Sequence, residues 1–163
     1  MMIYKASVDR FTKLTTVLCS LLIVGLPVVI FLNLEEDESY GVLAVPVILI
    51  VVMFVISRYR PIGYQVTPSE ILILRPTGTV SLKRSEISTI EILPKERLKR
   101  SIRTFGVGGF FGYWGEFSNK QMGPMTWYVT RRDNPVLIQT TKGKKIIISP
   151  DEPEKFVATV NLT

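Results

Sequence analysis

The sequence predicts an α+β membrane protein: two membrane-spanning helices come first, and a mainly β domain that ends in a helix follows. Two observations predict this class. Residues 14–34 and 40–57 form two long runs without a charged side chain, and a helix needs about 20 apolar residues to cross a hydrocarbon core about 30 Å thick. The remaining chain is divided by turn-forming residues into short segments rich in β-branched and aromatic side chains, which is typical of β-strands.

The two apolar runs are predicted to form a transmembrane hairpin. Only residues 35–39 separate the runs, and all of them except Ser39 are acidic. The segments that flank the hairpin on its other side are net basic. Lys5, Asp9, Arg10 and Lys13 precede the first run with a net charge of +2, and Arg58 and Arg60 follow the second. Because Lys and Arg favour the cytoplasmic ends of membrane helices, we expect residues 1–13 and 58–163 in the cytoplasm and the acidic loop outside. The expected protein is integral to the membrane, with two spans.

A buried core helix or a signal peptide is the alternative for one of the two runs. The second run, residues 40–57, is near the lower length limit for a span. Pro27 and Pro46 each remove a helical hydrogen bond. Membrane helices tolerate this loss, since neighbouring groups satisfy the freed carbonyls. The expected domains are therefore residues 1–13, two helices at 14–34 and 40–57 joined by the 35–39 loop, and one domain at 58–163.

The composition argues against catalysis in the predicted β domain. Residues 58–163 carry 17 of the 20 Lys and Arg residues but only 9 of the 14 Asp and Glu residues, and this length suffices for one small domain. The chain has no His, and its single Cys, Cys19, lies in a predicted span. The commonest general acid or base and the commonest metal ligand are thus missing. We expect no enzyme, no metal site and no cofactor.

The domain is predicted to consist of about seven strands followed by one helix. The predicted strands are residues 62–66, 71–74, 80–82, 87–93, 125–130, 136–140 and 145–149. Strands of this length and spacing, without helices between them, favour a small antiparallel sandwich or barrel. Asp151, Glu152 and Glu154 suit the first turn of a helix, where the helix dipole favours acids. Phe156 and Val160 then give that helix an apolar face, with which it can plug an open end of a barrel.

Three segments of the domain, residues 101–115, 128–138 and 148–156, are distinctive in sequence. Together with the preceding membrane helices they resemble the bacterial pleckstrin-homology-like membrane proteins, over roughly residues 60–161. The resemblance implies a PH-like barrel of seven bent antiparallel strands, capped by a C-terminal helix. It brings no catalytic residues with it, and a fold alone does not imply a function.

A basic cluster is the first candidate binding site. It follows the predicted strand 87–93 and consists of Lys95, Arg97, Lys99, Arg100 and Arg103, opposed only by Glu96. Near an anionic leaflet each Lys or Arg contributes about 1 kcal/mol to membrane binding, so one hypothesis is docking onto acidic lipid headgroups. A solvated surface and a protein or nucleic-acid contact are the alternatives. The turn at residues 76–78, which corresponds to the basic loop of phosphoinositide-binding relatives, has only Arg75 beside it.

A stretch in which glycines and aromatics are interleaved, residues 105–117, is the second candidate, which we call the glycine–aromatic stretch. Its spacing does not match a dinucleotide or phosphate-binding loop. Either its aromatic side chains fill the core and its glycines allow bulges, or some of the aromatics lie in the headgroup region of the membrane. We favour the core for most of them. The candidates for the membrane interface are Phe110, Tyr113 and Trp114.

The sequence and the resemblance thus predict a non-enzymatic, membrane-anchored interaction or scaffold module at the inner face of the bacterial cytoplasmic (inner) membrane. The expected partner is a protein or a second copy of the chain, because such barrels leave sheet edges that can pair with another strand. A lipid-sensing module that binds anionic headgroups through the basic 95–103 loop is one alternative, and an accessory subunit of a transporter or envelope enzyme is another. A nucleic-acid partner is not expected, since no nucleic-acid-binding motif is present.

Overall fold

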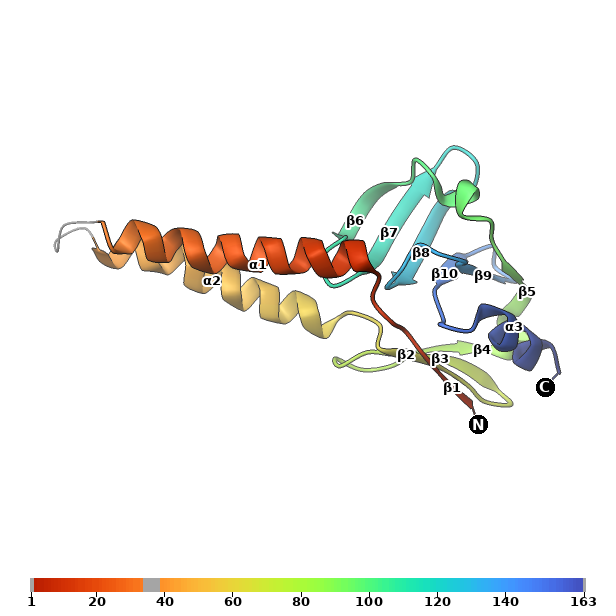
Figure 1. Ribbon diagram of the computed structural model, residues 1–163. Helices are drawn as coiled ribbons and strands as arrows, with labels where there is room; N and C mark the ends of the chain where they lie inside the picture. Colours follow the sequence, from red (N-terminus) through yellow and green to blue (C-terminus); the bar gives the residue numbers. More distant parts are fainter. Residues whose placement is uncertain (1, 34–38, 163) are drawn as a thin grey trace.

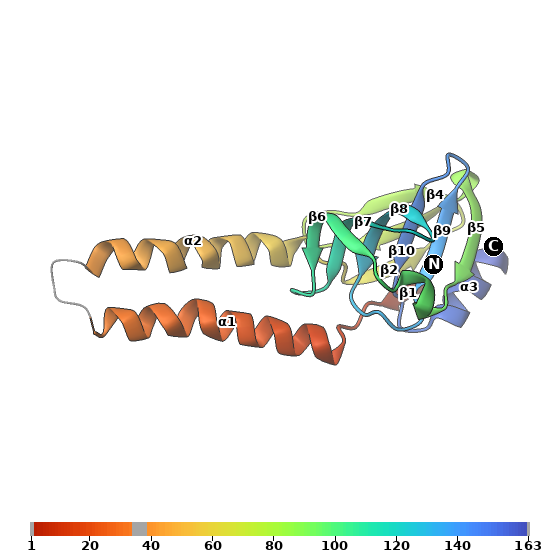
Figure 2. The same ribbon diagram turned by 90° about the horizontal axis from the view of Figure 1, so that it is seen from above.

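The computed structural model describes residues 2–33 and 39–162, and the side chains of residues 39–43 lie outside this description. The chain forms a pair of long helices and a mainly β domain (Figure 1). The helices α1 (Arg10–Phe31) and α2 (Ser39–Arg58) lie side by side and extend away from the domain in both views (Figures 1 and 2). The predicted acidic loop falls, apart from Ser39, outside the described residues.

Helix α1 begins at a regular N-cap, where the backbone N–H of Thr12 donates to Asp9 Oδ1 at 2.6 Å. Its 22 residues give a length of about 33 Å. Its apolar side chains are largely uncovered; Leu14 is 68% exposed and Leu21 is 64% exposed. Within the described residues, α1 is the one helix that is both long and apolar enough to cross a membrane. The described side chains of α2 make up a shorter apolar stretch, 44–58, so the second span stays a prediction.

The β domain contains two sheets. The first sheet has the order β1-β2-β3-β4, and all its pairs are antiparallel. The second has the order β5-β9-β10-β8-β7-β6, and only its β10–β8 pair is parallel. The strands are β1 (Met2–Lys5), β2 (Gly63–Val66), β3 (Glu70–Leu74), β4 (Val80–Lys83), β5 (Ile87–Ile92), β6 (Ile102–Gly108), β7 (Tyr113–Asn119), β8 (Gly123–Val129), β9 (Val136–Thr140) and β10 (Lys145–Ile148).

All seven predicted strands exist, at β2 to β5 and β8 to β10, but the described chain has three more. Strands β6 and β7 lie in the glycine–aromatic stretch, where frequent glycines hide the pattern of a strand. Strand β1 lies before α1, and its formation depends on a partner, β2, that is remote in sequence. The arrangement is therefore two sheets with one parallel pair, and it differs from the predicted seven-stranded antiparallel barrel.

Two apolar clusters form the core. The first joins both sheets and includes Tyr64, Ile73, Ile138 and Phe156, each with no exposed surface. Phe156 belongs to the C-terminal helix α3 (Pro153–Leu162), which covers this cluster as the sequence predicts. The second cluster lies in the six-stranded sheet and is built around Trp127, Phe117, Met125, Leu137 and Ile147. The rings of Phe117 and Trp127 stack in it, with their centroids 4.2 Å apart.

Two glycines face each other where β6 and β7 come closest. Gly106 pairs with Gly115, and their φ angles are +105° and +116°. A Cβ atom on Gly106 would lie 2.2 Å from the carbonyl oxygen of Trp114, and one on Gly115 would lie 2.4 Å from that of Phe105. Both positions therefore need glycine, because of the backbone conformation and because of the close approach of the two strands.

Gly106→Ala is expected to destabilise the protein far more than a glycine substitution that only strains the backbone. The matched control is Gly143→Ala, where φ is +78° and no atom lies within 4 Å of the added Cβ. Strain of that kind costs about 1–3 kcal/mol, whereas Gly106→Ala must also separate β6 from β7. Thermal unfolding of the full-length protein in detergent, followed by circular dichroism, measures both. Equal shifts in Tm for the two variants would contradict the close approach.

Candidate functional site

The two ends of the helix pair are held by the same sheet. β1 precedes α1 and β2 follows α2, and these strands pair over their whole length, from Met2 opposite Val66 to Lys5 opposite Gly63. The chain thus leaves the sheet, passes through both helices and returns to the neighbouring strand. This pairing ties both helices to the domain at one place, which we call the junction.

Three further contacts of the domain with the helices close the junction. The backbone N–H of Phe111, in the β6–β7 turn, donates to Thr16 Oγ1 of α1 at 3.0 Å. The ring of Trp114 stacks on Tyr59, just after α2, with centroids 5.6 Å apart. The N–H of Thr77, in the β3–β4 turn, donates to the carbonyl of Arg58 at 3.2 Å. The domain is therefore held with its β6–β7 and β3–β4 turns against the ends of the helices.

The segment between β1 and α1 is also fastened to the domain. Asp151 accepts hydrogen bonds from the backbone N–H of Ser7 at 2.9 Å and from its hydroxyl at 2.5 Å. Arg131 pairs with the same carboxylate, at 3.5 Å, and also donates to the carbonyl of Pro150 at 2.8 Å. Thr130 donates its hydroxyl to the carbonyl of Ser7 at 2.8 Å. These polar groups have a structural use, which sequence reasoning missed because Ser7 and Asp151 are remote in the chain.

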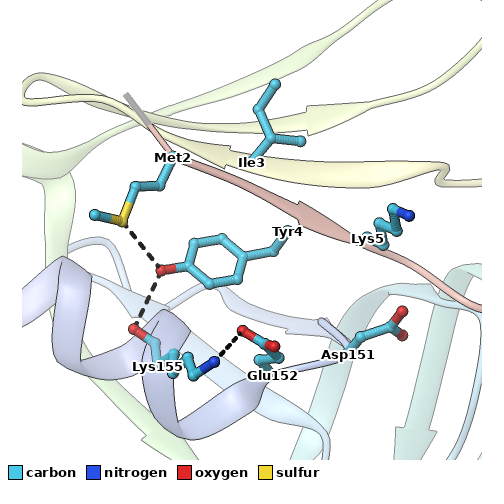
Figure 3. Close-up of a pocket in the computed structure, with 7 residues that line it drawn as sticks. All are labelled: Met2, Ile3, Tyr4, Lys5, Asp151, Glu152 and Lys155. Atoms are coloured by element: carbon cyan, nitrogen blue, oxygen red, sulfur yellow. Dashed lines mark hydrogen bonds and ion pairs between the residues drawn. The ribbon is translucent and has the colours of Figure 1, made fainter.

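A cavity of about 550 Å³ lies between β1 and α3 (Figure 3). It is lined by Met2, Ile3, Tyr4, Lys5, Asp151, Glu152 and Lys155. Figure 3 shows Tyr4 reaching across toward α3; its hydroxyl lies 2.7 Å from Thr159 Oγ1 and donates to the carbonyl of Lys155 at 3.3 Å. Lys155 in turn pairs with Glu152 at 3.0 Å. The contacts of Tyr4 attach β1 to α3. We therefore interpret the cavity as the packing boundary between these two elements and not as a ligand site.

A buried tyrosine organises the ends of three strands. Tyr64 has no exposed surface; its hydroxyl donates to the carbonyl of Tyr128 at 2.7 Å and accepts from the backbone N–H of Ser149 at 3.1 Å. Burial raises the pKa of Tyr64 from 10.0 to about 12, since the charged phenolate would lose its hydration. The hydroxyl therefore stays neutral and acts as a fixed donor and acceptor.

The basic cluster lies in the connection between β5 and β6 and at the start of β6. Its side chains come from a 3₁₀ turn (Lys95–Leu98), the loop after it and the start of β6, and all are exposed: Lys95, Arg97, Lys99, Arg100 and Arg103. Arg97 lies 3.6 Å from Glu91 and Lys99 lies 3.8 Å from Glu96. Such exposed ion pairs contribute little to the free energy of folding. The 3₁₀ turn lies farther from the helices than the β6–β7 turn does (Figures 1 and 2).

The three predicted interfacial aromatics lie in different places. Tyr113 is 2% exposed and belongs to the core, with the guanidinium of Arg132 4.2 Å from its ring centroid. Trp114 is half-buried on Tyr59, and Phe110 is half-buried against Phe111, with centroids 4.6 Å apart. The interfacial prediction is thus wrong for Tyr113. Sequence reasoning missed Phe111, whose backbone contacts α1. Its position between Gly109 and Gly112 is a pattern that indicates a tight turn.

The described residues hold no group of three or more His, Cys, Asp or Glu side chains that could bind a metal ion. The geometry defines a small β domain with a C-terminal helix. The domain is fixed to an apolar helix through the aromatic β6–β7 turn, and its basic cluster lies farther from that helix. Residues 62–162 match the family described as Bacterial PH domain. The chain belongs to this family, whose domain accounts for both sheets except β1, and for α3. Comparison with curated proteins and with solved structures found no match.

The raised pKa of Tyr64 predicts a loss of stability in strong alkali. Below pH 10 both the folded and the unfolded chain keep the proton, so the group adds no pH dependence. Between pH 10 and about 12 only the unfolded chain releases it, and the free energy of unfolding falls by about 3 kcal/mol over that interval. Unfolding of the wild type and of Tyr64→Phe, compared from pH 8 to pH 12, isolates this effect. An identical alkaline decline in both proteins would contradict the assignment.

Proposed function

We propose that this protein is a non-enzymatic interaction module that is anchored in the bacterial cytoplasmic membrane and holds its PH-like domain at the inner face. The observation that carries the proposal is the junction. A helix with an uncovered apolar surface, α1, is fixed to the domain by the β1–β2 pairing and by the hydrogen bond from Phe111 to Thr16. An apolar surface of this size needs lipid or protein around it. Domains of this family are generally non-catalytic.

The expected topology follows from the charges around the helices. Arg10 and Lys13 stand at the start of α1, and Arg58 and Arg60 stand at the end of α2. All four lie at the junction end, so the positive-inside rule favours a cytoplasmic domain. Both helices then cross the membrane, with the two termini inside.

Membrane anchoring predicts that the full-length protein stays in the membrane fraction after alkaline carbonate washing and leaves it only with detergent. Leu21→Glu together with Val24→Glu places two charges on the exposed side of α1, near the middle of the 14–34 run, and should release much of the protein, since each charge at the centre of a span costs about 3 kcal/mol. The control, Lys142→Glu with Lys144→Glu, changes exposed side chains in the β9–β10 turn and should change nothing. Release of the wild type by carbonate would refute anchoring.

The surface best suited to a protein partner is the free edge of the second sheet. Strand β6 is the end strand and pairs with β7 alone, so its outer backbone groups are open to another strand. Ile102 and Phe105 on this strand are 67% and 76% exposed. The basic cluster continues the same edge. Together they suit an extended, acidic protein segment that adds a strand to β6, with charge complementarity increasing the rate of encounter.

A photo-crosslinking residue at Phe105 tests this surface in cells. The expected result is an adduct with a protein, and Lys95→Glu with Lys99→Glu should reduce its yield about fivefold or more, because steering by these charges is lost. Lys142→Glu with Lys144→Glu is the matched control and should leave the yield unchanged. Adducts with lipid alone would favour docking of the basic cluster on anionic headgroups, and equal yields in both double variants would contradict a role for the cluster.

A further inference from the structure

A second pocket lies at the junction, where α1 meets the β6–β7 turn. Its volume is about 330 Å³, within the range of small ligand sites. It is lined by Val8, Lys13, Thr16, Val17, Arg60 and Phe111. Neither the basic cluster nor any of the predicted interfacial aromatics contributes to it. The residues come from three separate parts of the chain, so that only the folded junction brings them together.

The polar lining of this pocket suits an anion. Lys13 and Arg60 both line it, and within the described part of the chain neither forms an ion pair with an acid. The guanidinium of Arg60 lies 5.9 Å from the ring centroid of Phe111, which holds it at the pocket wall. Thr16 adds a hydroxyl, which can donate as well as accept. A guanidinium, an ammonium and a hydroxyl around one space are groups that bind phosphate.

The apolar lining indicates a ligand that also carries hydrocarbon. Val17 lies one helical turn beyond Lys13 and is 56% exposed; Val8 and Phe111 complete the apolar wall. Lys13 is the last charged residue before the uncharged run of α1. In a membrane, Lys13 therefore lies at headgroup level and Val17 at the edge of the hydrocarbon core. A phospholipid matches this arrangement, with its phosphate at headgroup level beside Lys13 and its acyl chains beside Val17.

We infer that this junction pocket binds the phosphate group of an anionic glycerophospholipid, with Lys13 and Arg60 on the phosphate and the acyl chains along α1. The inference rests on the proposed anchoring of α1. It assigns lipid recognition to the junction and not to the basic cluster, which lies farther from the helices. A lipid held there contacts both α1 and the β6–β7 turn, and so reinforces the attachment of the domain at the membrane surface.

Native mass spectrometry of the full-length protein in detergent tests the inference by counting bound lipids. The probes are phosphatidylglycerol, phosphatidylcholine and soluble sn-glycerol 3-phosphate. Phosphatidylglycerol should bind in preference to phosphatidylcholine, and Lys13→Gln with Arg60→Gln should weaken it about tenfold or more. Lys95→Gln with Arg97→Gln removes two charges from the basic cluster and should have no effect. Lys13→Arg with Arg60→Lys keeps both charges and should retain the binding.

Three results would overturn the inference: equal binding of both lipids, binding unaffected in Lys13→Gln with Arg60→Gln, or binding lost only in the basic-cluster variant. Saturation by sn-glycerol 3-phosphate at the affinity of the lipid would show a soluble phosphate site and refute the lipid assignment. Because Lys13 is exposed, Lys13→Gln alone is the test if the double variant does not fold. Carbonate washing separates the two proposals: release of the wild type refutes the anchoring, whereas retention with unselective lipid binding refutes only the pocket.

Discussion

The antiparallel pairing of β1 with β2 is the constraint on which the rest of the structure depends. It pairs the strand before α1 with the strand after α2, so both ends of the helix pair are attached to neighbouring strands of one sheet. Without it, the domain would be joined to the helices only by its chain connection to α2 and by the few contacts of its turns. With it, the β6–β7 and β3–β4 turns are held against the helix ends, and side chains from both parts of the chain share one pocket.

The junction also explains where several polar contacts between remote segments are found. Tyr4 reaches from β1 to α3, Asp151 accepts hydrogen bonds from Ser7, and Tyr64 connects the ends of β2, β8 and β10. Among these groups Tyr64 is fully buried, and a buried donor or acceptor costs about 1–3 kcal/mol when it is left without a partner. These contacts therefore favour one arrangement of the N-terminal strand over its alternatives.

Two surfaces remain for recognition, and they differ in character. The β6 edge with the basic cluster offers open backbone groups, exposed apolar side chains and positive charge, all of which suit a protein strand. The junction pocket is an open depression between α1 and the β6–β7 turn with apolar and cationic walls, which suit a lipid phosphate.

The sequence by itself determined the elements whose signals are local. Hydropathy located the apolar helices, turn residues bounded seven strands, and acids followed by Phe156 marked α3. Only the tertiary structure decided what depends on contacts between remote residues. Strand β1 forms only because β2 pairs with it. Strands β6 and β7 depend on the close approach of Gly106 and Gly115. Tyr113 packs in the core, whereas the backbone of Phe111 donates a hydrogen bond to Thr16. A strand or a pocket made by two distant segments leaves no periodic signal in either one, because the stabilising energy arises only when they meet.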